Sequence, residues 1–274
     1  MDKTETSQII PKVIHYCWFG RNPKSELVEK CIASWKAYCP DYEIIEWNED
    51  NVDINACPLY VREAYARKKW AFVTDYLRLK IIYENGGCYL DTDVELLKSL
   101  DGMRKHRAYL GCEGTDYVAT GLGFGAEAGF PFLRANMAVY EELNPINENG
   151  EFVSSPCPHY TTHLLKEAGV AFPIEQTYET EDGLVIYPNH FFNPYNWKTQ
   201  KLCVNKETVS IHHYSGSWMT EAQRKGYLQR AKSEQIERKF GSFAAKLYEI
   251  YFWNKKENGG AGLVKWFLKK LGGR

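Results

Sequence analysis

The stretch GGCYLDTDVE, residues 86–95, places two aspartates one residue apart directly after a short apolar run. Side chains alternate along a strand, so Tyr89, Asp91 and Asp93 are expected to share one face. Same-face neighbours on a strand lie roughly 6 to 7 Å apart, which suits two carboxylates that hold different parts of one cationic or polyhydroxyl ligand. Because two like charges this close repel, the stretch predicts a divalent cation, Mg²⁺ or Mn²⁺, held by oxygen ligands. A polar turn after an edge strand is the alternative.

The segments on either side of this stretch alternate between strand and helix patterns. Apolar runs predict strands, and helical spacing of apolar residues predicts helices. We expect strands at 12–20, 42–48, 108–114 and 208–218, and helices at 25–40, 60–85 (one or two) and 131–143. This alternation favours an α/β fold with a largely parallel sheet, in which the carboxyl ends of the strands line the ligand crevice.

The helix before the aspartates carries a charged pair on an otherwise apolar face. Asp75 and Arg78 are three residues apart and fall on the same face as Ala71 and Ile82. A surface salt bridge would look the same in sequence. Beside two apolar residues, however, the pair is expected to be partly buried near the strand that follows, and charged groups kept in such places are often functional.

Composition and charge exclude several classes of protein. The chain has 274 residues, with 34 Lys and Arg against 35 Asp and Glu, so no net field favours a nucleic acid partner. Its eight cysteines are scattered without a C-x-x-C pair, which indicates reduced, packed thiols rather than a zinc site or a disulfide framework. The polar N-terminus and the lack of an apolar run of membrane-spanning length predict a cytoplasmic protein.

The C-terminal residues differ from the rest of the chain. We expect one main domain at 1–240 and a helical tail at 241–274. Within the tail, residues 263–271 interleave leucine, tryptophan and phenylalanine with lysines. Such a short basic amphipathic helix can bind an anionic membrane surface, or it can pack its apolar face on the protein itself.

The motifs together resemble glycosyltransferase family 32. The resemblance rests on Ala71, Asp75, Arg78, Gly86, Gly87, Tyr89, Asp91 and Asp93, together with IPKVIHYCWFG at 10–20, FFNP at 191–194 and IHHYSGSW at 211–218. The resemblance implies a GT-A type fold with a mixed, mostly parallel sheet. It also implies a retaining, metal-dependent transferase that moves a sugar from a nucleotide-diphosphate sugar to a glycan or lipid-linked glycan, in capsule, exopolysaccharide or lipopolysaccharide synthesis.

The resemblance also implies a role for individual residues. Asp91, Asp93 and His213 would ligate the metal, Mn²⁺ or Mg²⁺. Strand alternation sends His212 and His213 in opposite directions, so only one should reach the metal. We expect His213, because His213-Tyr214-Ser215-Gly216 resembles the family's histidine motif.

The remaining implied roles concern the donor, for which a UDP-sugar is favoured over a GDP-sugar. Residues assigned to catalysis are Asp75, Arg78, Asp91 and Trp218. Residues assigned to the nucleotide sugar are Trp18, which would stack on the base, and Asp75, Arg78, Tyr89, Asp91, Ser217 and Trp218.

One segment departs from the family pattern, and two other functions stay open. Thr120-Gly121 stand where similar proteins often have an asparagine, which leaves the acceptor contacts undetermined. CYLDTDVE also fits the nucleophile motif of haloacid dehalogenase-like phosphatases, with Asp91 as the phosphorylated residue. That motif normally lies near the N-terminus, unlike here. A sugar-nucleotide-binding protein without catalysis would keep the aspartates but would not need Asp75 and Arg78.

Overall fold

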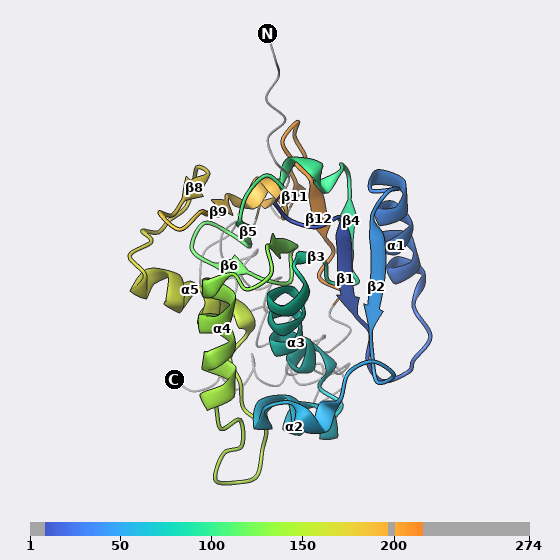
Figure 1. The fold of residues 1–274 in the computed structure, drawn as a ribbon, viewed down its shortest axis with the longest axis vertical. Coiled ribbons are helices and arrows are strands. Elements are labelled where there is room, and N and C mark those ends of the chain that lie inside the picture. Colours follow the sequence, from blue (N-terminus) through green and yellow to red (C-terminus); the bar gives the residue numbers. More distant parts are fainter. Residues whose placement is uncertain (1–8, 197–200, 216–274) are drawn as a thin grey trace, which may run out of the picture. The chain divides into compact units, whose positions relative to one another are not determined.

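The computed structural model describes residues 9–196 and 201–215, which form a mixed eight-stranded sheet with helices on both faces (Figure 1). The first half contains β1 (Val13–Cys17), α1 (Glu26–Tyr38), β2 (Glu43–Trp47), α2 (Leu59–Ala66), α3 (Trp70–Asn85), β3 (Gly87–Tyr89), β4 (Val94–Leu96) and β5 (Ala108–Cys112). The second half contains β6 (Val118–Ala119), β7 (Phe124–Ala126), α4 (Pro131–Glu142), α5 (Cys157–Glu167), β8 (Tyr178–Glu179), β9 (Leu184–Tyr187), β10 (Tyr195–Asn196), β11 (Lys201–Leu202) and β12 (Ser210–His212). The expected α/β class is confirmed.

The sheet is less parallel than we expected. Its order is β2-β1-β3-β7-β5-β9-β8, with β6 paired to β5. Strands β2, β1 and β3 run parallel, as do β5 and β9, but β7 is antiparallel to both β3 and β5. A parallel pair needs a long crossover, and the links between β5, β6 and β7 are too short for one. These strands therefore pair antiparallel.

Helix α1 anchors the segment that follows the two aspartates. Its N-cap is Ser25, whose side chain accepts a hydrogen bond from the Val28 N–H. Trp35, fully buried, donates its indole N–H to the Val94 carbonyl over 2.7 Å, and the Ser34 hydroxyl accepts from the Leu96 N–H over 2.9 Å. These bonds satisfy polar groups of β4, which is not part of the main sheet.

Helix α3 ends where the glycines predict. Gly86 has φ 68° and its N–H donates to the Ile82 carbonyl, which closes the helix at the entry to β3. Gly87 has φ 99°, and a Cβ there would lie 2.9 Å from the Val13 carbonyl oxygen. The two glycines let the chain leave α3 and pair at once with β1.

The two aspartates do not continue a strand, contrary to our expectation. Strand β3 ends at Tyr89, and Asp91 and Asp93 lie in a turn in which the Val94 N–H donates to the Asp91 carbonyl over 3.0 Å. The reason is that β4 leaves the main sheet to pair antiparallel with β12. The turn lies at the carboxyl end of β3, where a ligand crevice is expected in an α/β sheet.

Apolar side chains form a core on each face of the sheet. Helices α2, α3, α4 and α5 contribute to one cluster, which includes Tyr76, Phe124 and Ile186. Helix α1 contributes to the other, with Ile14 and Tyr109. Figure 1 shows α1 beside β1 and β2, and α4 and α5 on the other side of α3. The sheet is thus covered on both faces, as expected of α/β proteins.

Several expectations concern residues outside the described ranges. Ser217, Trp218, the domain boundary at 240 and the amphipathic segment 263–271 all lie there. Within the described part of the chain, no helix combines the length and apolarity required to cross a bilayer. All eight cysteines are described and are free thiols. Seven are buried, which confirms the prediction of packed thiols for these seven, whereas Cys203 is exposed.

Candidate functional site

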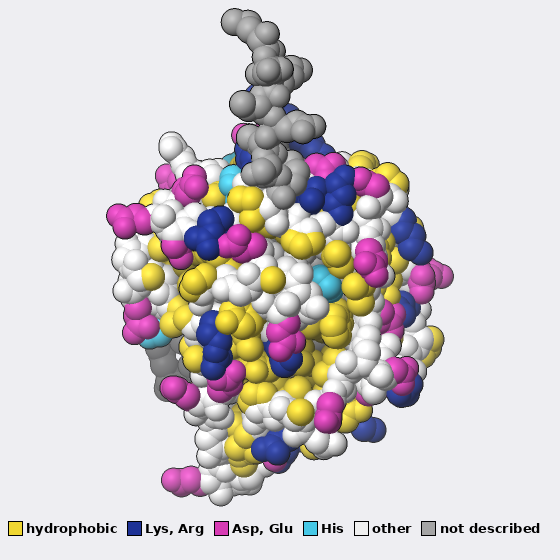
Figure 2. All heavy atoms as spheres, in the orientation of Figure 1, with side chains coloured by type: hydrophobic (Ala, Val, Ile, Leu, Met, Phe, Trp, Pro, Cys, Tyr) yellow, Lys and Arg dark blue, Asp and Glu magenta, His cyan; other side chains and the backbone are white. Residues whose placement is uncertain are grey.

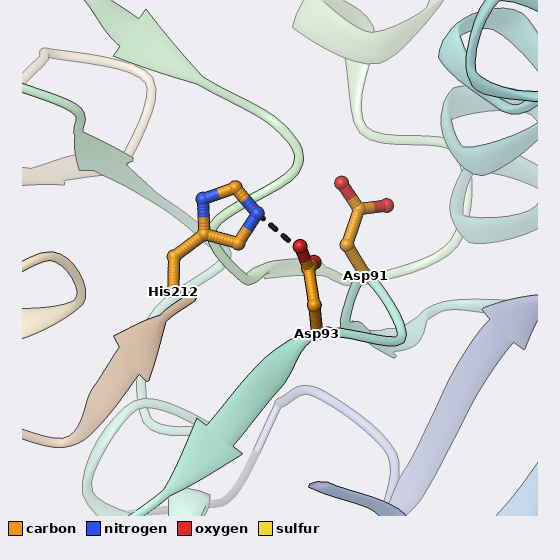
Figure 3. A group of neighbouring side chains, drawn as sticks. All are labelled: Asp91, Asp93 and His212. Carbon is orange, nitrogen blue, oxygen red and sulfur yellow. Dashed lines mark ion pairs between the residues drawn. The ribbon is translucent and has the colours of Figure 1, made fainter. Parts of the chain in front are cut away.

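Asp93 is held by the end of β12, from which His212 points toward it (Figure 3), and by the residues directly after this strand. The His212 Nε2 atom lies 3.1 Å from Asp93 Oδ1, and the Ser215 N–H donates to Asp93 Oδ2 over 2.8 Å. Between them, Tyr214 has φ 48°, in the left-handed region that non-glycine residues rarely adopt. This conformation turns the Ser215 N–H back toward the carboxylate, and strained residues of this kind cluster at functional sites.

The structure corrects our choice of histidine. His212, not His213, lies beside the aspartates. His213 Nε2 instead lies 2.8 Å from Glu95 Oε2, which also accepts from Lys30. In the antiparallel pairing of β12 with β4, His212 is opposite Val94, so alternation sends the next side chain to the other face.

Asp75, Arg78 and Asp91 form a second charged group, centred on the guanidinium. Arg78 NH2 lies 3.2 Å from Asp75 Oδ1 and 3.4 Å from Asp91 Oδ1. The Arg78 side chain is 3% exposed, Asp75 9% and Asp91 25%. The guanidinium also donates to Thr74 through Nε and NH2 and lies over the buried ring of Tyr89, 5.3 Å from its centroid. The pair predicted from sequence is therefore buried.

Burial and charge set the protonation of these groups. Burial is the largest cause that raises the pKa of Asp75 to about 6, against the opposing charge of Arg78. The pKa of Asp91 is also raised, chiefly by desolvation and in part by the like charge of Asp93. Desolvation acts to raise the pKa of Asp93 as well, but the charge of His212 and the bonds from Ser215 hold it far below its ordinary range. The two aspartates of the turn are thus electrostatically different.

The residues present fit a divalent cation. Asp91, Asp93 and His212 each offer a ligand atom, and these atoms lie within 4.8 Å of one another. Two carboxylates and an imidazole are donors typical of Mn²⁺ sites. The His212 Nδ1 atom is buried and finds no hydrogen-bond partner in the described ranges, so the ring is held by the contact of Nε2 with Asp93 and by the edge-on packing of the Tyr214 ring.

A glycine gives Asp91 and Arg78 room to meet. A Cβ at Gly121 would lie 2.4 Å from Asp91 Oδ2 and 2.9 Å from Arg78 NH1. Next to it, the Thr120 hydroxyl contacts the Cys157 thiol over 3.7 Å, and this thiol is 4.0 Å from Arg78 NH1. The segment Thr120-Gly121 therefore packs directly against the charged group.

Trp18 and the FFNP element lie at other places around the site. Trp18 follows β1 and donates its indole N–H to the Asn22 carbonyl, with Lys24 over its ring. Asn193 is fully buried and donates to the Tyr214 hydroxyl over 2.6 Å and to the Glu113 carbonyl over 2.7 Å. It therefore joins the carboxyl end of β5 to the segment that holds Asp93.

The site lies within and beside a segment that matches a known family. Residues 25–110 match the family described as "Glycosyltransferase sugar-binding region containing DXD motif". Over this segment the chain is similar to a glycosyltransferase sugar-binding region. The aspartates that match the DXD motif are Asp91 and Asp93, and the matched segment also includes the buried pair Asp75 and Arg78. His212 is brought to the matched segment from outside it by the pairing of β12 with β4.

The comparisons also find similar proteins. "Inositol phosphoceramide mannosyltransferase 3" of Schizosaccharomyces pombe is 28% identical in an alignment over 142 residues that covers 46% of this chain and 36% of that protein. The chain thus spans about a third of the length of this relative. Two solved structures share limited similarity with this chain. One, titled "PaToxG Glycosyltransferase", has a TM-score of 0.41 and 19% identity over 58% of this chain and 70% of that one. The other, a glycosyltransferase involved in the glycosylation of the major capsid of PBCV-1, has a TM-score of 0.44 and 11% identity over 80% and 100%.

Sequence reasoning missed one carboxylate near this site. Glu113 follows the buried strand β5, and its electrostatic neighbours include His212 and His159. Burial raises its pKa. The signal that could have found it is the one that found the aspartates, namely an acidic residue directly after a buried strand whose carboxyl end faces the crevice.

Proposed function

We propose that the protein is a metal-dependent, retaining glycosyltransferase that uses a nucleotide-diphosphate sugar. The observation that carries this proposal is that Arg78, Asp91, Asp93 and His212 form one continuous charged group at the matched sugar-binding region. The mixed sheet would act as the nucleotide-binding sheet of a GT-A type fold. A protein that only bound sugar nucleotides would not need the buried pair of Asp75 and Arg78 beside the proposed metal ligands.

The reaction breaks the bond between the sugar anomeric carbon and the phosphate oxygen and forms a bond to an acceptor hydroxyl oxygen. Bound Mn²⁺ or Mg²⁺ supplies charge neutralisation for the diphosphate that leaves. Asp91, Asp93 and His212 would hold this cation. Asp75 and Arg78 would bind the sugar hydroxyls, since Arg78 is fixed by Thr74, Asp75 and Asp91. The acceptor attacks on the side of the leaving group, and the leaving phosphate oxygen takes its proton.

The relative's name and the C-terminal sequence suggest a donor and an acceptor. The S. pombe relative is named a mannosyltransferase, so a nucleotide-activated mannose is a candidate donor in addition to the UDP-sugars. For the acceptor we propose a glycan or lipid-linked glycan of capsule, exopolysaccharide or lipopolysaccharide synthesis. The basic and apolar composition of residues 263–271 supports action at the cytoplasmic surface of a membrane.

The test is a screen of donors for stabilisation and slow hydrolysis. UDP-glucose, UDP-galactose, UDP-N-acetylglucosamine and GDP-mannose are each added with and without Mn²⁺ while the melting temperature and diphosphate release are measured. We expect one donor to stabilise the protein only with metal and to be hydrolysed to the nucleoside diphosphate. Asp93→Ala should lose both effects, because it removes a metal ligand that is nearly buried.

A control variant distinguishes the loss of a proposed metal ligand from the loss of any one carboxylate. Asp41 is exposed, precedes β2 and pairs with Lys12 at the amino end of the strands, so Asp41→Ala should retain both effects. If no sugar nucleotide binds but a phosphate ester is cleaved with Mg²⁺, the transferase proposal is wrong. Asp91 would then be tested as a phosphatase nucleophile.

A further inference from the structure

An exposed aromatic pair lies at one rim of the site. The rings of Tyr117 and His159 stack with their centroids 5.1 Å apart and an interplanar angle of 29°. Tyr117 is 43% exposed, and His159, in the first turn of α5, is exposed as well. Two aromatic rings that face each other at the surface leave one outer face of the stack for a ligand.

The pair is held on a rigid base. The Glu113 N–H donates to the Tyr117 carbonyl over 2.8 Å, and the Thr115 carbonyl accepts from the Ile174 N–H over 2.9 Å. The Val118 N–H donates to the Thr162 hydroxyl of α5 over 2.9 Å. This bond joins β6, which begins directly after Tyr117, to the helix that carries His159. A surface fixed in this way loses little conformational entropy when a ligand binds.

Short contacts connect this rim to the charged group. One segment runs from Tyr117 through β6 to Thr120, and another joins His159 to Cys157. Both segments therefore connect the aromatic pair to the contact between Thr120 and Cys157, which lies beside Arg78. Glu113 faces the charges of both His159 and His212. Residues from β5, β6 and α5 therefore lead from the metal-binding residues outward to the ring pair.

We propose that Tyr117 and His159 form the platform on which the acceptor's sugar ring stacks, and that Glu113 accepts hydrogen bonds from its hydroxyls. This inference rests on the proposed transferase function and specifies its acceptor as a carbohydrate. An aromatic face packs on the C–H face of a sugar ring, while a carboxylate accepts strong hydrogen bonds from hydroxyl groups. Together they hold a ring in one orientation.

The charges at the rim further define the acceptor. Asp116 adjoins Tyr117 and hydrogen bonds with Thr115, so Glu113 and Asp116 place two acidic side chains on this short loop. A phosphorylated or carboxylated sugar at the platform would be repelled by these groups. The terminal acceptor sugar is therefore expected to be uncharged.

The experiment compares transfer with donor hydrolysis, in which water replaces the acceptor. The full chain is assayed with the donor found above and with methyl glycosides of glucose, galactose, mannose and N-acetylglucosamine in both anomers. We expect transfer to at least one glycoside. Tyr117→Ala should lower kcat/KM for that glycoside about tenfold, mainly through KM, and leave donor hydrolysis unchanged. Tyr117→Phe, which retains the ring, should keep transfer near the wild-type level.

Tyr38→Ala is the matched control, since Tyr38 ends α1 and is 44% exposed, and it should transfer normally. The inference is overturned if Tyr117→Ala transfers as well as the wild type, or if the donor is hydrolysed but no glycoside is accepted. A wild type that does not hydrolyse any donor would instead overturn the proposed function on which the inference rests. The two failures are thus distinguished by the hydrolysis measurement alone.

Discussion

Gly121 shows how one missing side chain shapes the charged group. Alanine at this position would place its Cβ 2.4 Å from Asp91 Oδ2 and 2.9 Å from Arg78 NH1, so the carboxylate and the guanidinium would have to move apart. We expect Gly121→Ala to lower donor hydrolysis at least tenfold and to cost about 1–3 kcal/mol of unfolding free energy, as overpacking does. Enzyme assays and urea denaturation check both values.

Gly102→Ala is the control for this substitution. A Cβ there meets nothing within 4 Å and its φ is not in the left-handed region, so activity and stability should stay near the wild type. Equal activity of the two variants would show that the approach of Gly121 to Asp91 is not needed for the site.

Asp75 should make stability depend on pH. Its pKa rises from 3.8 to about 6 on folding, chiefly through burial, so the folded state binds the proton more tightly than the unfolded state. The contribution of Asp75 to stability is therefore fully present below about pH 4 and falls as the pH rises to about 6. Asp75→Asn does not titrate.

The unfolding free energy of Asp75→Asn should therefore increase relative to that of the wild type as the pH rises from about 4 to about 7. The gain is at most about 3 kcal/mol, from about two pKa units at 1.36 kcal/mol each. Urea denaturation of both proteins across this range measures it. Parallel stability curves would mean that Arg78 keeps Asp75 ionised throughout.

At the scale of elements, the pairing of β12 with β4 decides which histidine meets the aspartates. His212→Ala should abolish the stabilisation of the protein by Mn²⁺, because it removes one of the three residues that fit the cation. His213→Ala removes only the contact with Glu95 and should keep the Mn²⁺ effect with a small loss of melting temperature. Thermal melts with and without Mn²⁺ test this, and the reverse pattern would show that the register is shifted by one residue.

The elements also show why the strands were easier to predict than their pairing. Glycines 86 and 87 and the buried runs around them indicated α3 and β3 because local patterns reflect local burial and backbone conformation. The turn after Tyr89 was not visible, since it depends on β4 pairing with a strand more than a hundred residues away in sequence. Partners at that distance leave no mark on the local pattern.

At the scale of the whole molecule, burial of thiols gives a simple measure of the native fold. Seven of the eight cysteines are buried and Cys203 is exposed. Burial raises the pKa of Cys17 and Cys88 to about 12, which lowers the thiolate fraction that reacts. We expect a thiol reagent to modify about one cysteine quickly in the native protein and all eight in denaturant. Rapid native modification of several thiols would show that the core opens readily.

The charged side chains on one face of the molecule are of both signs. Figure 2 shows Lys and Arg side chains interspersed with Asp and Glu on the visible face, without a region of one sign. This mixture of signs on the visible face matches the near-equal numbers of basic and acidic residues, 34 and 35. The charges that matter for function are thus local and lie at the end of β3.

The sequence by itself determined the α/β class, the aspartate pair, the buried pair of Asp75 and Arg78, and the packed thiols. Each of these depends on side chains close together in the chain, where helical or strand periodicity places them. Only the tertiary structure decided that His212 reaches Asp93, that Gly121 admits Asp91, and that Glu113 interacts electrostatically with both His159 and His212. These contacts join segments whose distance in space depends on the packing of the complete sheet, and a shift of one residue in the pairing of β12 with β4 would bring a neighbour of His212 to Asp93 in its place.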